Sequence, residues 1–152
     1  MAYVSPPVQA IQGRVRRSGW TRLAYGLYAL TPRTLTEELR AWSLVLPEGA
    51  AFSHLTAVEA RGWWRPEPVA RPVFAAVSVG DATPHRTGLL VSRHPKRPPS
   101  EIYDGVRLTT PAETMLAAAR DLGVLDLVII GDSALRQNHC TLEELSERAA
   151  QR

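Results

Sequence analysis

The chain has 152 residues, 45% of them hydrophobic; this fits one domain with a sizeable core and excludes a wholly disordered chain. No apolar run reaches the roughly 20 residues of a membrane helix, and the N-terminus lacks the continuous apolar segment of a secretory signal. A single cysteine, Cys140, excludes an internal disulfide framework, so a cytoplasmic location without membrane contact is expected.

Charge is distributed unevenly along the chain. Residues 1–107 contain fourteen basic and eight acidic residues, whereas residues 108–152 contain four basic and seven acidic residues. The first 33 residues carry five arginines and no acidic residue. A basic N-terminal segment indicates an anionic partner such as DNA, although a basic segment that is merely solvated would give the same pattern.

The first 47 residues predict strands followed by one helix. Residues 1–12 are expected to lack regular structure, and residues 14–30 are expected to form wing-like strands, in which Gly26 marks a bulge or a close backbone approach. Thr34 fits the N-cap of a capping box, so a helix is predicted to begin there and to continue to Pro47.

The middle of the chain is predicted to supply most of the sheet. Apolar or alternating segments bounded by turn signals predict strands at 50–52, 73–80, 88–95 and 102–110. The last of these is a strand or a hairpin with its turn at Asp104–Gly105. A helix that begins at Ser53 and ends at Gly62 is expected between the first two.

Three helices are predicted in the tail. Thr110 and Glu113 provide the N-cap and N3 signals of the first, which is expected to run to Gly123. Its inward-facing residues are predicted to be Met115, Leu116, Ala119 and Leu122. Residues 124–137 are apolar nearly all round, which predicts a buried central helix or, alternatively, a buried strand. Thr141 begins the last helix with a capping box.

Together these elements predict an α+β fold, a small mixed or antiparallel sheet packed by about five helices with a truncated N-terminal wing-like segment. The expected division is a basic N-terminal segment at residues 1–33 and an α/β core domain at residues 34–152.

Two pairs of side chains are candidates for an anion or partner site. Ser53 and His54 stand at a predicted helix start, where free backbone N–H groups could bind an anion; simple capping with a half-buried histidine is the alternative. Asp132 lies within an apolar helix with Arg136 one turn later. It is a functional carboxylate, one half of an i,i+4 ion pair, or the partner of another arginine.

Basic side chains are candidates for contact with nucleic acid. They are Arg14, Arg16, Arg17, Arg22, Arg93, Lys96 and Arg97. The last three belong to a basic segment around one predicted strand, which could bind phosphate or could simply protect a strand edge from aggregation.

The sequence contains no recognised catalytic motif. It has no Gly-rich phosphate loop and no CxxC, HExxH or GxSxG pattern. Lys96 is the single lysine, and no carboxylate lies two residues before it, which removes the acid–x–Lys pair used by many metal-dependent nucleases. We therefore expect a non-enzymatic protein with no cofactor and no metal site.

Several segments occur in an order that resembles a bacterial family. They are GLYAL, AFSHLTAVEARGWW, VFAAVSV, TGLLVSRHP, GVRLTTPAETMLAAARDL and VIIGDSALRQNHCTLEEL. Over residues 20–148 the chain resembles the region shared by AbiEi-type antitoxins of type IV toxin–antitoxin systems. The same region precedes the nuclease domain of actinobacterial very-short-patch-repair-like endonucleases.

Some segments that are typical of the family are present in this chain, and others are missing. Family members usually begin with a winged helix-turn-helix; the wing-like strands are present here, but Val4–Ile11 contains two prolines and cannot supply the helices. The nuclease segment expected after residue 152 is missing, and Ala117 stands where relatives often have aspartate.

The function implied is a non-enzymatic antitoxin-like or transcription-regulatory domain. Its partners would be a cognate toxin protein and DNA, the latter contacted with weak sequence preference through the basic N-terminal face. The alternatives are a DNA-contacting N-terminal fragment of a very-short-patch-repair-like endonuclease without its catalytic domain, and a degraded relative without activity.

Overall fold

The computed structural model describes residues 10–12, 19–30, 34–66 and 72–151 of the chain. Within these ranges five α-helices and two sheets are present, which confirms the predicted α+β class. None of the helices in the described ranges is long and apolar enough to cross a membrane.

The larger sheet has five strands in the order β6-β5-β4-β8-β7. They are β4 (Ala51–Phe52), β5 (Val73–Ser78), β6 (Leu89–His94), β7 (Ser100–Tyr103) and β8 (Val106–Thr109). The sheet is mixed, because β6 runs parallel to β5 and β4 parallel to β8, whereas β4–β5 and β7–β8 are antiparallel. The β7–β8 hairpin turns at Asp104 and Gly105, whose φ angles of 47° and 77° suit a tight two-residue turn.

The smaller sheet has three antiparallel strands in the order β1-β3-β2. They are β1 (Ala10–Gln12), β2 (Trp20–Ala24) and β3 (Leu27–Leu30). Strand β1 corrects the prediction that residues 1–12 lack regular structure, since Ala10 pairs with Ala29, a distant partner that local composition does not reveal. The pairing of β2 is irregular between Arg22 and Ala24, and Gly26 lies in the following turn with a φ of 72°.

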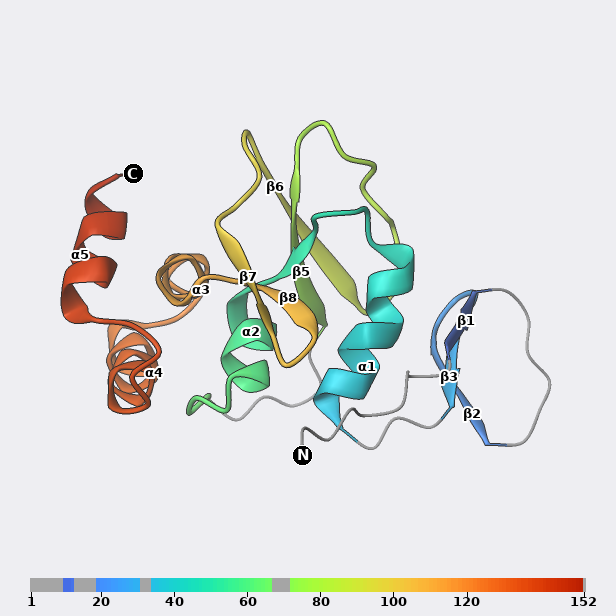
Figure 1. The fold of residues 1–152 in the computed structure, drawn as a ribbon, viewed down its shortest axis with the longest axis horizontal. Coiled ribbons are helices and arrows are strands. Elements are labelled where there is room, and N and C mark those ends of the chain that lie inside the picture. The colour runs from blue at the N-terminus through green and yellow to red at the C-terminus, as the bar shows by residue number, and fades with distance from the viewer. Residues whose placement is uncertain (1–9, 13–18, 31–33, 67–71, 152) are drawn as a thin grey trace, which may run out of the picture.

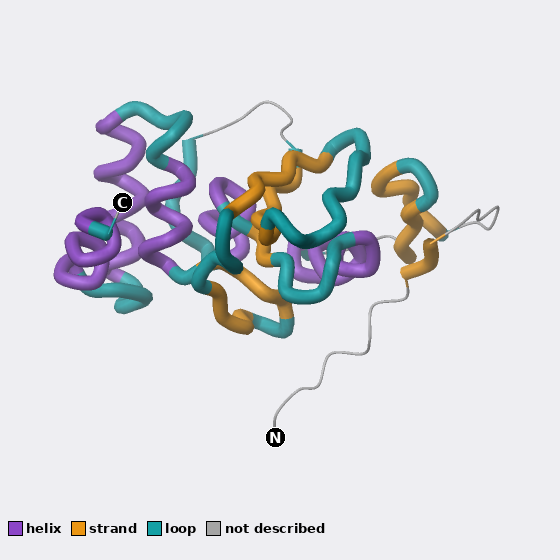
Figure 2. Tube along the Cα trace, turned by 90° about the horizontal axis from the view of Figure 1, so that it is seen from above, coloured by secondary structure: helices purple, strands orange, loops and turns teal. Residues whose placement is uncertain are grey.

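Helices cover both faces of the larger sheet. They are α1 (Leu35–Trp42), α2 (His54–Ala60), α3 (Pro111–Ala118), α4 (Val124–Arg136) and α5 (Leu142–Ala150). Figures 1 and 2 show α1 beside one face and α2 beside the other, with α3–α5 beyond α2, and the three-stranded sheet beyond α1 at the opposite end from α4 and α5.

Alternate residues of β5 contact two hydrophobic clusters. Ala75 belongs to the first, which includes Phe52, Leu108, Leu39 and Trp42 and takes in Ala24 and Leu27 around the smaller sheet. Phe74 packs against the second, formed by Leu55, Val58, Trp63, Ile130, Ala134 and Cys140. The side-chain period of two along a strand therefore divides the core into two layers.

Two predicted helix ends are wrong. Helix α1 ends at Trp42, and a 3₁₀ turn (Ser43–Val45) precedes Pro47. The Ser43 hydroxyl donates to the carbonyl of Leu39 at 3.0 Å, a local bond that competes with further helical pairing. Helix α3 ends at Ala118, and Ala119, predicted to face inward, is exposed.

The segment predicted as a buried central element is a helix, but it is not buried all round. Helix α4 packs inward with Ile130, Gly131 and Ala134, while Val124 and Leu125 at its start are 79% and 72% exposed. The prediction failed because an apolar side chain gains free energy from burial but does not determine whether it is buried. The packing of neighbouring helices decides which side of α4 is covered.

Candidate functional site

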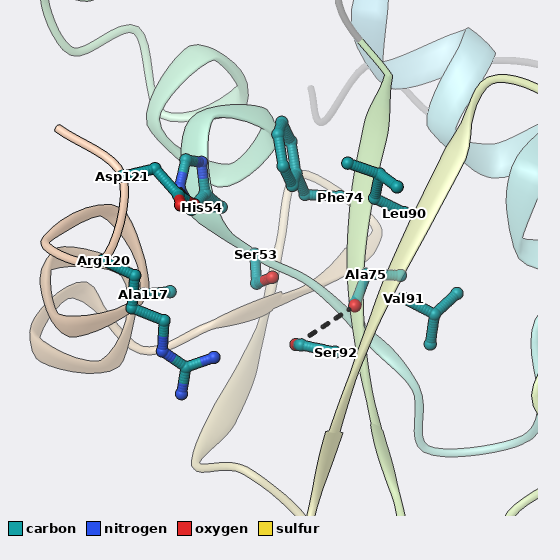
Figure 3. Close-up of a pocket in the computed structure, with 10 residues that line it drawn as sticks. All are labelled: Ser53, His54, Phe74, Ala75, Leu90, Val91, Ser92, Ala117, Arg120 and Asp121. Carbon is teal, nitrogen blue, oxygen red and sulfur yellow. Dashed lines mark hydrogen bonds and ion pairs between the residues drawn. The ribbon is translucent and has the colours of Figure 1, made fainter.

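A cavity of about 260 Å³ lies between the chain after α3 and the strands β5 and β6 (Figure 3). Apolar groups form most of its wall: Phe74, Ala75, Leu90, Val91 and Ala117. Polar groups complete the lining: Ser53, His54, Ser92, Arg120 and Asp121. The two residues predicted from the start of the second helix are thus brought together with residues from three other segments.

His54 is held from two sides at the edge of this cavity. The residue is 6% exposed, and its ring stacks on Phe74 with centroids 4.3 Å apart and an angle of 21° between the planes. Its Nε2 lies 3.0 Å from Oδ2 of Asp121, which follows it by 67 positions. The contact ties the chain after α3 to the start of α2. The expected half-buried histidine is therefore almost fully buried.

Ser53 occupies the N-cap position of α2 without capping it. The residue is 3% exposed, and its side chain forms no capping hydrogen bond. The backbone explains this geometry, because His54, the next residue, has a φ of 53°, far from the helical value. Ser53 lines the cavity, and Figure 3 shows its hydroxyl on the side that faces Ala75 and Ser92.

Arg120 brings a positive charge to the cavity. It is exposed, and it forms no ion pair with another residue in the described part of the chain. On the opposite wall the Ser92 hydroxyl lies 3.4 Å from the carbonyl of Ala75 and 3.1 Å from Nε2 of His94. The Asp121 carboxylate, which contacts His54 and has a side chain that is 67% exposed, places a negative charge at the same cavity.

Asp132 and Arg136 do not line the cavity. They form an i,i+4 ion pair on α4, with Oδ2 and Nε 2.9 Å apart and side chains that are 55% and 79% exposed. This is the ion-pair alternative that the sequence left open, and such an exposed pair contributes little to stability. The four residues predicted as one possible site therefore lie in two separate places.

Two arginines of the predicted nucleic-acid-binding set hold backbone carbonyls. Arg93 donates to the carbonyl of Val79 at 2.9 Å, and Arg97 donates to that of Glu48 at 3.4 Å. Lys96 is exposed. These contacts give both guanidinium groups a structural role while leaving them at the surface.

The N-terminal arginines are described only in part. Arg14, Arg16 and Arg17 lie outside the described residues. Arg22 is exposed on β2, with its Nε 3.4 Å from the carbonyl of Ala24 and its guanidinium carbon 5.5 Å from the centre of the Tyr25 ring. The predicted basic face is thus represented here by one side chain of the smaller sheet.

Helix α4 presents an apolar face outward. Val124, Leu125 and Val128 are 79%, 72% and 60% exposed. Since residues three, four and seven apart lie on one side of a helix, Asp132 continues this face one turn further along. A face of three large apolar side chains ending in a carboxylate is unusual for a surface that only meets water.

Arg61 is a buried residue in contact with the β7–β8 hairpin, and the sequence analysis did not single it out. The Arg61 side chain is 1% exposed, and its Nη2 lies 2.8 Å from both Oε1 of Glu101 and the carbonyl of Thr109. Its guanidinium carbon lies 5.6 Å from the Trp63 ring centre and 5.0 Å from that of Tyr103. An arginine in a predicted helix carries no local signal for a hydrogen-bond partner such as Thr109, which is 48 positions away.

His139 and Cys140 lie close to this arginine. Burial, reinforced by the Arg61 guanidinium, lowers the pKa of His139, in keeping with the 2.6 Å hydrogen bond that Trp63 Nε1 donates to its Nδ1. Burial also raises the pKa of the Cys140 thiol. Both groups are therefore held in their neutral forms, which suits a structural role.

No group of three or more His, Cys, Asp or Glu side chains within the described ranges is placed to hold a metal ion. In comparisons with known proteins, no family model matches the chain and no curated protein sequence is significantly similar to it.

Proposed function

We propose that this chain is a non-enzymatic, antitoxin-like domain that binds a protein partner through α4 and contacts DNA through its basic N-terminal segment. The observation that carries the proposal is the outward apolar face of Val124, Leu125 and Val128. Protein interfaces are built around such apolar centres, which a polar rim surrounds.

The charge around this face favours a basic partner surface. Asp132 continues the face within its ion pair with Arg136, and the side chain of Asp121, just before α4, is 67% exposed. Residues 108–152 as a whole carry seven acidic and four basic residues. Complementary charge speeds encounter and disfavours wrong partners, so the partner should present an apolar patch bordered by lysine or arginine.

The resemblance to AbiEi-type antitoxins supports the choice of partner. If the resemblance holds, the partner is a nucleotidyltransferase-like toxin whose gene lies beside the gene of this chain. The alternative, a DNA-contacting piece of a very-short-patch-repair-like endonuclease, is distinguished by gene context, because it requires downstream coding for a nuclease domain.

The partner proposal is tested with the purified product of the neighbouring toxin-like gene. Substituting Val124→Ser, Leu125→Gln and Val128→Thr together should weaken the complex by about 100-fold, since each buried apolar contact at an interface centre contributes about 1 kcal/mol. Calorimetric titration measures the change, and growth rescue of toxin-expressing cells gives a second readout.

A matched control carries the same kind of change elsewhere. Ile102→Thr and Val79→Thr alter side chains that are 62% and 50% exposed on other surfaces, and this double variant should bind as the unaltered protein does. Equal affinity of the α4 variant and the control would show that the partner does not bind α4. Failure of the unaltered chain to bind the toxin-like protein would remove the antitoxin proposal.

DNA contact should be weak, salt-sensitive and nearly independent of sequence. Arg14, Arg16, Arg17 and Arg22 can neutralise four phosphates, which gives a slope of log K against log salt concentration of about −3.6. Replacing all four with alanine should remove most of the binding and flatten the slope. Fluorescence anisotropy with several duplexes over a range of salt concentrations measures both; tight, salt-resistant binding to one duplex by the alanine variant would place the DNA contact elsewhere.

A further inference from the structure

We propose that the cavity between α3 and β6 binds a small monocarboxylate with an apolar body, held by the Arg120 guanidinium and the Ser53 hydroxyl. This inference goes beyond partner binding and does not depend on it. The cavity of about 260 Å³ is smaller than most pockets for drug-sized molecules, which measure roughly 300–1,000 Å³, so its occupant is small.

The first observation is the Ser53 side chain. It is 3% exposed, lines the cavity, and forms no hydrogen bond with another described residue, although it stands where a serine normally caps a helix. The hydroxyl is open to the cavity. A ligand oxygen placed there can accept a hydrogen bond from it.

The second observation is the charge at the cavity. The Asp121 carboxylate lies against His54 Nε2 at 3.0 Å with its side chain 67% exposed, whereas Arg120 forms no ion pair within the described ranges. A cation and an anion therefore both border the cavity, and the cation is the group that attracts a ligand carboxylate. A planar guanidinium matches a carboxylate through two parallel hydrogen bonds, and a single positive charge suits a ligand with a single negative charge.

The third observation is the apolar part of the cavity lining. Phe74, Val91 and Ala117 line the cavity, and Leu90 borders it with 54% of its surface exposed. An aliphatic or aromatic body would cover this wall and remove apolar surface from water. Asp121 would repel the carboxylate from the His54 side, so the ligand is oriented with its anionic end toward Arg120 and Ser53.

The Ser92 hydroxyl borders the same cavity but already has partners of its own. It lies 3.4 Å from the carbonyl of Ala75 and 3.1 Å from Nε2 of His94, so the anionic end of the ligand is held by Arg120 and Ser53. Figure 3 shows Ser53, Ser92 and Arg120 around the same part of the cavity.

The test is a titration of the isotope-labelled full chain with benzoate, followed by two-dimensional NMR. Shift changes should be confined to the cavity residues around Ser53, Phe74, Leu90 and Arg120. Benzamide, which has the same shape and no charge, should bind at least about tenfold more weakly, because the charge-assisted hydrogen bond is lost. Inorganic phosphate, which lacks an apolar body, should also bind more weakly than benzoate.

Three variants assign the contacts. Arg120→Gln should weaken benzoate binding by about tenfold, whereas Arg136→Gln, which alters an exposed arginine on α4, should leave it unchanged. Ser53→Ala removes no hydrogen bond of the free protein, so it should keep its fold while binding benzoate about threefold more weakly. If Ser53→Ala fails to fold, Arg120→Gln still decides the matter, since Arg120 is exposed.

The proposal is overturned by any of three results. They are the absence of localised shifts with benzoate, binding of benzamide or phosphate as tight as that of benzoate, and binding of benzoate by Arg120→Gln as tight as by the unaltered chain. None of these results bears on toxin binding through α4, which is measured separately.

Discussion

Replacing Arg148 with alanine is expected to lower the free energy of unfolding by about 3 kcal/mol. Oε2 of Glu113, a residue that is 3% exposed on α3, accepts hydrogen bonds from Nε and Nη2 of Arg148 on α5 at 2.9 and 2.7 Å. The alanine variant leaves this carboxylate buried without its charge partner. Urea denaturation of the purified chain measures the loss.

Two further variants separate the buried charge from other causes. Arg136→Ala removes an arginine from the exposed pair with Asp132 and should cost only about 0.3–0.5 kcal/mol. Replacing both Glu113 and Arg148 with methionine removes both charges from the interior and should recover most of the stability. An Arg148→Ala midpoint equal to that of Arg136→Ala would show that α5 is not held to α3 through this pair.

Local signals in the sequence predicted local structure well. The Asp104–Gly105 turn, the capping box of Thr141 with Glu144, and the N-cap of Thr34 are all present. Each depends on residues within three positions of one another, where side-chain chemistry and backbone conformation are directly linked. The α+β class followed from the same elements taken together.

The cavity could be predicted only in part, because its residues meet across long separations. Ser53 and His54 were singled out as a candidate anion site, but Asp121 lies 67 positions after His54, and Arg120 stands in a turn that shows no binding pattern. Likewise Glu113 looked like a helix-start residue, and its partner 35 positions away appears only in the packing of α5 on α3. Such pairings are set by tertiary packing rather than by local propensity.

The outward side of α4 illustrates a different limit. Leu125, Leu127 and Ile130 are equally apolar in the sequence, yet their exposures differ widely, with Leu125 at 72% and Ile130 at 0%. Hydropathy reports what a side chain gains on leaving water, whereas the neighbours of the helix determine which side chains do so. The apolar face that supports the proposed partner site was therefore hidden within a segment predicted to be buried.

Substituting Ile130→Ala is expected to destabilise the protein by about 2–5 kcal/mol. Ile130 is fully buried in the cluster that joins α4 to Leu55 and Val58 of α2 and to Trp63, so the truncation removes apolar contacts and leaves a cavity. Leu127→Ala, at a partly buried position one turn earlier, should cost less. Leu125→Ala, on the outward face, should change the free energy of unfolding by less than about 0.5 kcal/mol.

The three variants form a series that reads out the orientation of α4. Denaturant midpoints of the isolated chain should fall in the order Leu125→Ala, Leu127→Ala, Ile130→Ala, with the last the least stable, because the exposed fraction of the original side chain decreases in that order. Equal losses of stability in Leu125→Ala and Ile130→Ala would mean that both sides of α4 are covered in the isolated chain. The face proposed for the partner would then not be free to bind one.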